Sequence, residues 1–242
     1  MGATGSALFL TALVQGRSGV VDLLRRFLIW RVKLRWYVFA ILGLPVIKVL
    51  IGYLLSGSGK AFLAFSPASL ALYPAAYIPH FFFGPLFEEA AWRGFALPRL
   101  QGLHGPLKGT FILGILWGVW HLPVYLPSNI QNSGMMAGIV SFTVFLIVTL
   151  AMTVIFTWLF NNTKGSLLLA VLLHACIDGT ATYIHILVAK NILPSSAAGS
   201  IEFGLMLGCI GLAVLLILVT RGRLGYDTYR RSAEFVDYPV QA

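Results

Sequence analysis

Long apolar runs separated by short polar stretches dominate the pattern of this chain. A helix needs about 20 residues to cross a bilayer, and runs of about that length lie at residues 37–55, 70–87, 110–126, 138–160, 166–189 and 203–220. The chain is 58% hydrophobic and only 10% charged, against about 25% charged residues in soluble domains. These features predict an all-α, multi-pass integral membrane bundle with six transmembrane helices.

The N-terminal part adds two further expected elements. Residues 7–14 form a short apolar run, which is expected to be a seventh helix or part of one. Residues 20–36 mix apolar side chains with five basic ones, a pattern typical of an amphipathic helix lying on a membrane surface. We expect one domain over 1–242, with an interfacial segment at 17–36, a motif core at about 70–189 and a solvated cytoplasmic tail at 221–242.

The basic residues indicate how the chain is oriented in the membrane. If the six runs cross in turn, fourteen of the 17 Lys and Arg residues fall on one side, whereas only Lys60 and Lys190 fall on the other. Such an excess marks the cytoplasmic side. Topology and anionic headgroups account for the net charge of +9, so no nucleic-acid partner is expected. The two cysteines lie within predicted spans and do not suggest a disulfide framework.

Ionisable groups interrupt three of the apolar stretches. Glu88 stands eleven positions from Arg99, and His121 stands thirteen positions from Lys108. His174 and Asp178 stand ten and fourteen positions from Lys164. These separations correspond to roughly 15 to 21 Å along a helix. Such groups are costly at membrane depth and usually face a protein interior or act there. We therefore expect these four residues to share one polar layer, either as a reactive site or as a hydrogen-bond network that joins helices.

Spacing within each predicted helix indicates which side chains share a face. Residues four positions apart lie on one helix face. Three pairs have this spacing: Glu89 with Arg93, Trp117 with His121, and His174 with Asp178. Glu89 and Arg93 are expected to form an ion pair, while Glu88 points about 100° away from Glu89. Trp117 is expected to wall the pocket of His121. The remaining histidines, His80, His104 and His185, are interpreted as structural because no partner at matching depth is evident.

These residue types favour hydrolysis by activated water. A carboxylate and an imidazole can share a proton of water and direct its oxygen at a carbonyl, and a second histidine can donate to the developing oxyanion. Neither Ser166 nor Cys176 has a convincing position as a nucleophile. Two histidines with carboxylates could also hold zinc, although the chain has no H-E-x-x-H helix.

Three motifs resemble those of one protein family. The run from Glu88 to Arg93 resembles E-E-x-x-x-R, the run from Trp117 to His121 resembles F-x-x-x-H, and the run from His174 to Asp178 resembles H-x-x-x-N/D. In this order they are similar to the CPBP family of intramembrane proteases, which includes type II CAAX prenyl endopeptidases and bacteriocin-processing or immunity proteins. The resemblance covers about residues 70–189.

The resemblance implies a role for each position. Glu88 and His121 would activate water, His174 and Asp178 would support the oxyanion, Glu89 and Arg93 would brace the site, and no metal or other cofactor would be needed. Trp117 departs from the usual Phe. Asp178 stands where eukaryotic CAAX enzymes have Asn, so it would either be protonated beside the oxyanion or orient His174 and fix its tautomer, and we favour the second role.

The chain is therefore expected to be a glutamate-type intramembrane endopeptidase in a prokaryotic plasma membrane, with its site open to the cytoplasm. Membrane lipids and a hydrophobic or lipidated peptide or protein are the expected partners. Two alternatives are a non-proteolytic scaffold or immunity-type binding protein and a zinc-dependent membrane protease. A proton-coupled transporter is disfavoured because the sequence shows no repeat symmetry.

Overall fold

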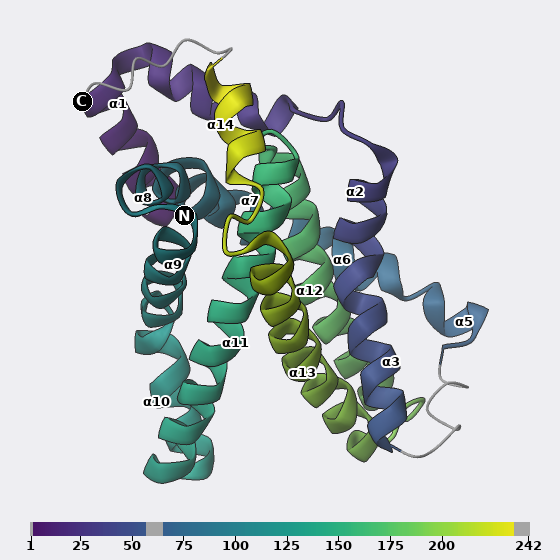
Figure 1. Ribbon diagram of the computed structural model, residues 1–242. Coiled ribbons are helices and arrows are strands. Elements are labelled where there is room, and N and C mark those ends of the chain that lie inside the picture. Colours follow the sequence, from purple (N-terminus) through teal and green to yellow (C-terminus); the bar gives the residue numbers. More distant parts are fainter. Residues whose placement is uncertain (1, 57–64, 235–242) are drawn as a thin grey trace. The chain divides into compact units, whose positions relative to one another are not determined.

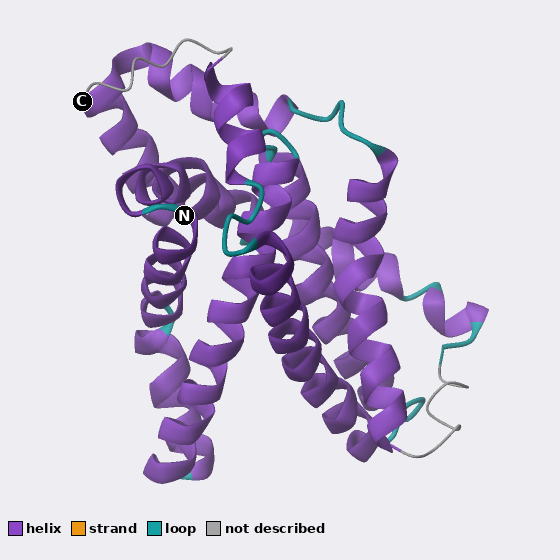
Figure 2. Cartoon of the chain, in the orientation of Figure 1, coloured by secondary structure: helices purple, strands orange, loops and turns teal. Residues whose placement is uncertain are grey.

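The computed structural model describes residues 2–56 and 65–234, which form helices and short connections without a strand (Figures 1 and 2). Among these residues, five helices are long and apolar enough to cross a membrane, or six if one bent pair is a single span. The prediction of an all-α, multi-pass membrane protein is confirmed. Lys60 and the part of the expected tail after residue 234 lie outside the described residues.

The chain divides into two compact units, Met1–Ala91 with Ser166–Gly208, and Trp92–Gly165 with Cys209–Ala242. We call them unit 1 and unit 2. The elements of unit 1 are α1 (Gly2–Arg25), the 3-10 helix η1 (Arg26–Leu28), α2 (Leu34–Val38), the π-helix η2 (Phe39–Gly43), α3 (Leu44–Ser56), α5 (Pro67–Leu70), α6 (Tyr73–Phe82), α7 (Pro85–Glu89), α12 (Leu167–Ala189) and the first half of α13 (Ser195–Thr220).

The central element of unit 1 is α12, which packs against α3, α6, α7, η1 and η2. Its most apolar stretch is 72% buried, whereas the other single-helix candidate spans are between 22% and 33% buried. The helix begins where the Ser166 hydroxyl accepts a hydrogen bond from the Leu169 amide at 3.3 Å, a common N-cap. Polar side chains on α12 such as His174 and Thr180 are therefore buried.

Unit 2 is organised around α11 (Met135–Asn162), which packs against α9 (Pro106–Trp120), α10 (Leu122–Ser133) and α14 (Tyr226–Glu234). The π-helix η3 (Ala90–Ala96) leads into α8 (Leu97–His104), which packs against α9. Gly114 and Gly118 lie where α9 meets Leu150 and Leu146 of α11, close enough that an added Cβ would clash. Small residues at this spacing let membrane helices approach closely.

Two of the predicted spans are interrupted. The run 70–87 contains no single helix, because α6 ends at Phe82 and α7 begins only at Pro85. Proline disfavours helical geometry at the residue before it, and Gly84 adopts φ +98° there. The run 110–126 bends by 53° between α9 and α10, where Pro123 enters the first turn of α10. His121 lies at this bend.

The predicted surface helix at 20–36 is also wrong in its extent. Helix α1 continues from Gly2 to Arg25 with a kink at Gly16, and the candidate span Gly2–Leu28 includes the predicted run 7–14. Residues 29–33 are not helical. Side-chain hydroxyls bond to the backbone here, since the carbonyls of Ile29 and Trp30 accept from the hydroxyls of Ser166 at 2.7 Å and Tyr37 at 2.6 Å.

The C-terminal segment is not simply a solvated tail, because its first part folds onto unit 2. Leu224 and Tyr229 are buried, and the ring centroids of Tyr229 on α14 and Phe160 on α11 are 5.3 Å apart. The Asn161 side chain donates to the Leu224 carbonyl at 3.0 Å and exchanges hydrogen bonds with Gln101 of α8. The mixed charges of this segment do not predict these contacts from the sequence.

Unit 1 also contains an ion pair between two spanning helices. The Lys48 side chain of α3 is 1% exposed, and its ammonium donates to the Glu202 carboxylate of α13 at 2.6 Å. Pairing is the usual way to retain such groups at membrane depth. The helices cross closely here because Gly52 lies against Ile201, and Gly204 lies against the Lys48 carbonyl.

Replacement of Gly204 by alanine should destabilise unit 1. The new Cβ would lie 2.5 Å from the Lys48 carbonyl oxygen and 2.7 Å from the Gly52 nitrogen, and overpacking of this kind costs about 1–3 kcal/mol. Thermal unfolding in detergent should show a lower Tm for Gly204→Ala. The matched control is Gly199→Ala on the same helix, where a Cβ meets nothing within 4 Å. Equal Tm values for the two variants would contradict this packing.

Candidate functional site

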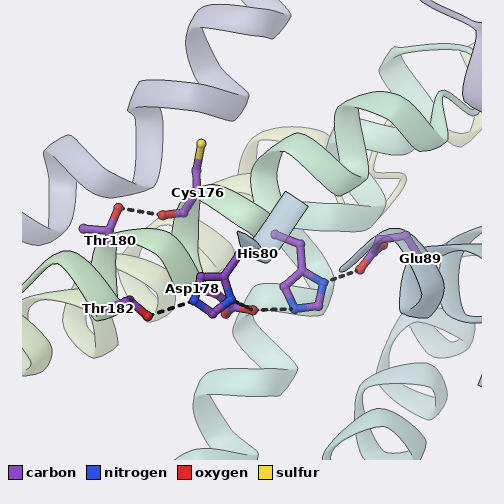
Figure 3. A network of polar contacts seen from close by, with 7 residues as sticks. His80, Glu89, Cys176, Asp178, Thr180 and Thr182 are labelled. Carbon is purple, nitrogen blue, oxygen red and sulfur yellow. Dashed lines mark hydrogen bonds and ion pairs between the residues drawn. The ribbon is translucent and has the colours of Figure 1, made fainter. Parts of the chain in front are cut away.

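A polar stripe runs along one face of α12 in unit 1. His174, Asp178 and Thr182 follow one another at i,i+4 spacing, and Figure 3 shows their neighbours from α6 and α7. Cys176 lies on the same helix, but Figure 3 shows its sulfur directed away from Asp178 and His80. Its thiol is buried and free. Ser166 is occupied as the N-cap of α12, so neither residue is placed as a nucleophile within the stripe.

The closest contact in this stripe joins two buried groups. His174 Nδ1 lies 2.8 Å from Glu89 Oε1, with the Glu89 side chain 0% and the His174 side chain 9% exposed. An ionised carboxylate only accepts hydrogen bonds, so it fixes the proton of the ring on Nδ1. Glu89, expected only to brace the site, therefore holds the orientation of His174 directly.

Asp178 occupies the other side of the His174 ring. Its Oδ2 atom lies 3.6 Å from His174 Nε2, which is longer than a hydrogen bond. The tautomer-fixing contact at Nδ1 is thus made by Glu89 rather than by Asp178, contrary to the role that we favoured from the sequence. Asp178 instead stands beside the other ring nitrogen, Nε2.

His80 is the residue of this network that sequence reasoning missed. It was interpreted as an isolated structural histidine, but its Nε2 lies 2.8 Å from the Thr182 hydroxyl, and its Nδ1 lies 3.9 Å from Asp178 Oδ2 (Figure 3). The available signal was Thr182, which continues the i,i+4 series of His174 and Asp178. A polar partner of that series would lie on a helix packed against α12, and α6 is such a helix.

His121 belongs to unit 2, where its ring is held at the bend between α9 and α10. Its Nδ1 lies 2.8 Å from the Trp117 carbonyl oxygen. A carbonyl can only accept, so Nδ1 carries the proton and the neutral ring has a basic Nε2. Trp120 and Phe145 contact the ring edge to face, with centroids 4.9 and 5.3 Å away. The expected aromatic wall is present and includes more than Trp117.

Arg93 is also in unit 2 and is fully buried. Its guanidinium carbon lies 4.1 Å from the ring centroids of both Trp117 and Phe156, an arrangement that stabilises a cation by its position over aromatic faces. Trp117 therefore supports Arg93 as well as His121. The predicted pairing of Arg93 with Glu89 stays a prediction.

The structure thus brings together part of the predicted site. Glu89, His174 and Asp178 form one network in unit 1, and Glu88 is half-buried at the end of α7 in the same unit. The joint action of Glu88 with His121 stays a prediction. Over residues 2–56 and 65–234, no group of three or more His, Cys, Asp or Glu side chains is arranged to hold a metal ion.

Comparison with known proteins agrees with the three motifs. Residues 69–180 match the family model described as type II CAAX prenyl endopeptidase Rce1-like, and this segment contains every predicted site residue. The CAAX prenyl protease 2 of Methanococcus maripaludis is 32% identical over 97 residues, which is 38% of this chain and 34% of that protein. The chain therefore matches about a third of the length of this curated relative.

Replacement of Glu89 by alanine should destabilise the protein more than replacement by glutamine. Alanine leaves the buried His174 Nδ1–H without this acceptor, which costs about 1–3 kcal/mol, whereas the amide oxygen of glutamine can still accept. Thermal unfolding of the two variants in the same detergent measures the difference. A Glu89→Ala variant as stable as the wild type would show that the contact contributes little.

Proposed function

We propose that the chain is an intramembrane endopeptidase that hydrolyses a peptide bond with an activated water, because residues 69–180 match the type II CAAX prenyl endopeptidase family model. The observation that carries the proposal is the environment of His174, a buried histidine with a carboxylate near each ring nitrogen. In the proposal both ring nitrogens of His174 carry a proton, because an imidazole is a donor at both positions only in that form.

In this proposal His174 is the oxyanion donor. Glu89 holds Nδ1, so Nε2–H is directed away from that contact and toward the position of the substrate carbonyl oxygen. A fixed donor at the developing oxyanion contributes more than one that must reorient during the reaction. Burial of the ring strengthens the interaction, because a low local dielectric increases the attraction between opposite charges.

Glu88 and His121 are proposed to activate the water. The Trp117 carbonyl holds the Nδ1 proton of His121, which leaves Nε2 as a base, and Glu88 supplies a carboxylate. As the water oxygen bonds to the carbonyl carbon, its proton passes to this pair. The proton then moves to the leaving nitrogen as the C–N bond breaks, so that an acid and an amine are released and the protein is unchanged.

The proposed substrate is a membrane-associated peptide or the end of a membrane protein, with the scissile bond in the cytoplasmic half of the bilayer of a prokaryotic cell. The membrane depth expected from the sequence supports this proposal. The four titratable positions, Glu88, His121, His174 and Asp178, lie closer to the basic side, which is predicted to be cytoplasmic. Hydrophobic and lipidated peptides are both reasonable probes, and a prenylated peptide is one of them.

Replacement of Glu88 by glutamine, or of His121 by alanine, should lower kcat for cleavage of a hydrophobic peptide library by at least about 100-fold. General acid–base groups typically contribute factors of 10² to 10⁴. His104→Ala is the matched control for His121, since His104 is an exposed histidine of the same unit. Cleavage at the wild-type rate by both Glu88→Gln and His121→Ala would refute the proposed roles.

Cleavage by the purified wild-type protein should persist after treatment with a strong chelator, because the proposed base and oxyanion donor are side chains. Activity that disappears with chelator and returns with zinc would establish the zinc-dependent alternative instead. If no peptide is cleaved, while Glu88→Gln preserves the cellular phenotype and changes to neighbouring apolar residues abolish it, the chain acts as a binding scaffold and the endopeptidase proposal fails.

A further inference from the structure

Asp178 presents a difficulty for the proposed oxyanion site. Its Oδ2 atom lies 3.6 Å from His174 Nε2, the atom proposed to donate to the oxyanion. An ionised carboxylate at this place would repel the developing negative charge and would also compete for the same N–H. The site therefore needs something that holds the Asp178 carboxylate in place and offsets its charge.

His80 is placed to do both. It reaches Asp178 from α6, a different helix, with Nδ1 3.9 Å from the same oxygen that faces His174. This separation is an ion-pair distance rather than a hydrogen bond. The Asp178 side chain is 37% exposed and the His80 side chain 32% exposed, so Asp178 lacks the enclosure that fixes Glu89, and its position depends on such neighbours.

The other ring nitrogen of His80 is anchored on α12. His80 Nε2 lies 2.8 Å from the Thr182 hydroxyl, one helical turn beyond Asp178. A hydroxyl can donate to a bare ring nitrogen or accept from a protonated one. Thr182 can therefore hold the ring in either form, with Nδ1–H directed at Asp178 in both.

We propose that His80 is a positioning residue of the peptidase site, which holds the Asp178 carboxylate between two imidazoles and so keeps it from taking the His174 Nε2–H that the proposed function assigns to the oxyanion. This inference rests on the proposed function and extends it by one residue outside the three motifs. His80 touches neither the water nor the substrate. It acts through Asp178, and Thr182 acts through His80.

The test measures peptide cleavage by the purified full chain and by two matched histidine variants. His80→Ala should lower kcat roughly tenfold to a hundredfold with KM changed less than about twofold, because small misplacements of catalytic groups cost rate rather than binding. His185→Ala, at an exposed position of α12, should behave as the wild type. If His80→Ala also behaves as the wild type, the inference is wrong.

A double-mutant cycle separates positioning from a purely structural effect. In an Asp178→Asn background the carboxylate that His80 is proposed to offset is gone, so adding His80→Ala should lower kcat by less than about twofold. Two residues that act through each other show this non-additivity. An equal loss in both backgrounds would mean that His80 only supports the fold, and would overturn the inference.

A second readout does not require activity. In protein labelled with ¹⁵N in the histidine rings, His80→Ala should shift the ring resonances of His174, identified by their loss in His174→Gln, while His185→Ala should leave them in place. Unshifted His174 resonances in His80→Ala would overturn the inference. A wild-type protein that cleaves nothing but shows the expected shift would refute the proposed endopeptidase and leave the His80–Asp178–His174 coupling standing.

Discussion

The hydrogen bond between Glu89 and His174 is the interaction on which the site in unit 1 depends. It joins α7 to α12 through two buried polar groups at 2.8 Å, where either group alone would be costly at membrane depth. Local structure makes the contact possible. Gly84 and Pro85 end the preceding helical segment and start α7 anew, so Glu89 is presented by a short helix packed on α12 rather than by one long span.

Other buried polar groups of the described structure also have partners. Lys48 is paired with Glu202, Gln101 exchanges amide hydrogen bonds with Asn161, and Arg93 lies over two aromatic rings. These partnerships give buried polar groups a charged, hydrogen-bonding or aromatic neighbour inside the bundle, and polar contacts of this kind join membrane helices. The His174 network differs from them in one respect. Its carboxylates and imidazoles are more numerous than a helix contact needs, and Asp178 and His80 remain partly exposed.

Hydrophobic run length predicted the fold class and placed α11, α12 and most of α13 well, because these helices have no internal proline to interrupt them. It failed where proline residues and hydrogen bonds from side-chain hydroxyls to the backbone decide the local conformation. The breaks before Pro85 and near Pro123 divide two predicted spans, and hydroxyls from Ser166 and Tyr37 hold residues 29 and 30 outside a helix.

For the site, spacing within one helix was informative and contacts between helices were not. The i,i+4 relation of His174 and Asp178 put both on one face, and the motif order led to the family that residues 69–180 match. The partner of His174 could not be read from spacing, because Glu89 lies 85 residues away in the chain. His80 was missed for the same reason, since its contacts with Asp178 and Thr182 appear only once α6 is packed on α12.

The central claim is that Glu88, His121 and His174 act on one peptide carbonyl. An experimental structure of the protein with a peptide aldehyde, whose hydrate mimics the tetrahedral intermediate, tests it most directly. The account predicts one hydrate oxygen within hydrogen-bond distance of His174 Nε2 and the other within reach of both Glu88 and His121 Nε2. A His121 ring that faces lipid, or that lies too far from Glu88 to share one water molecule, would contradict it.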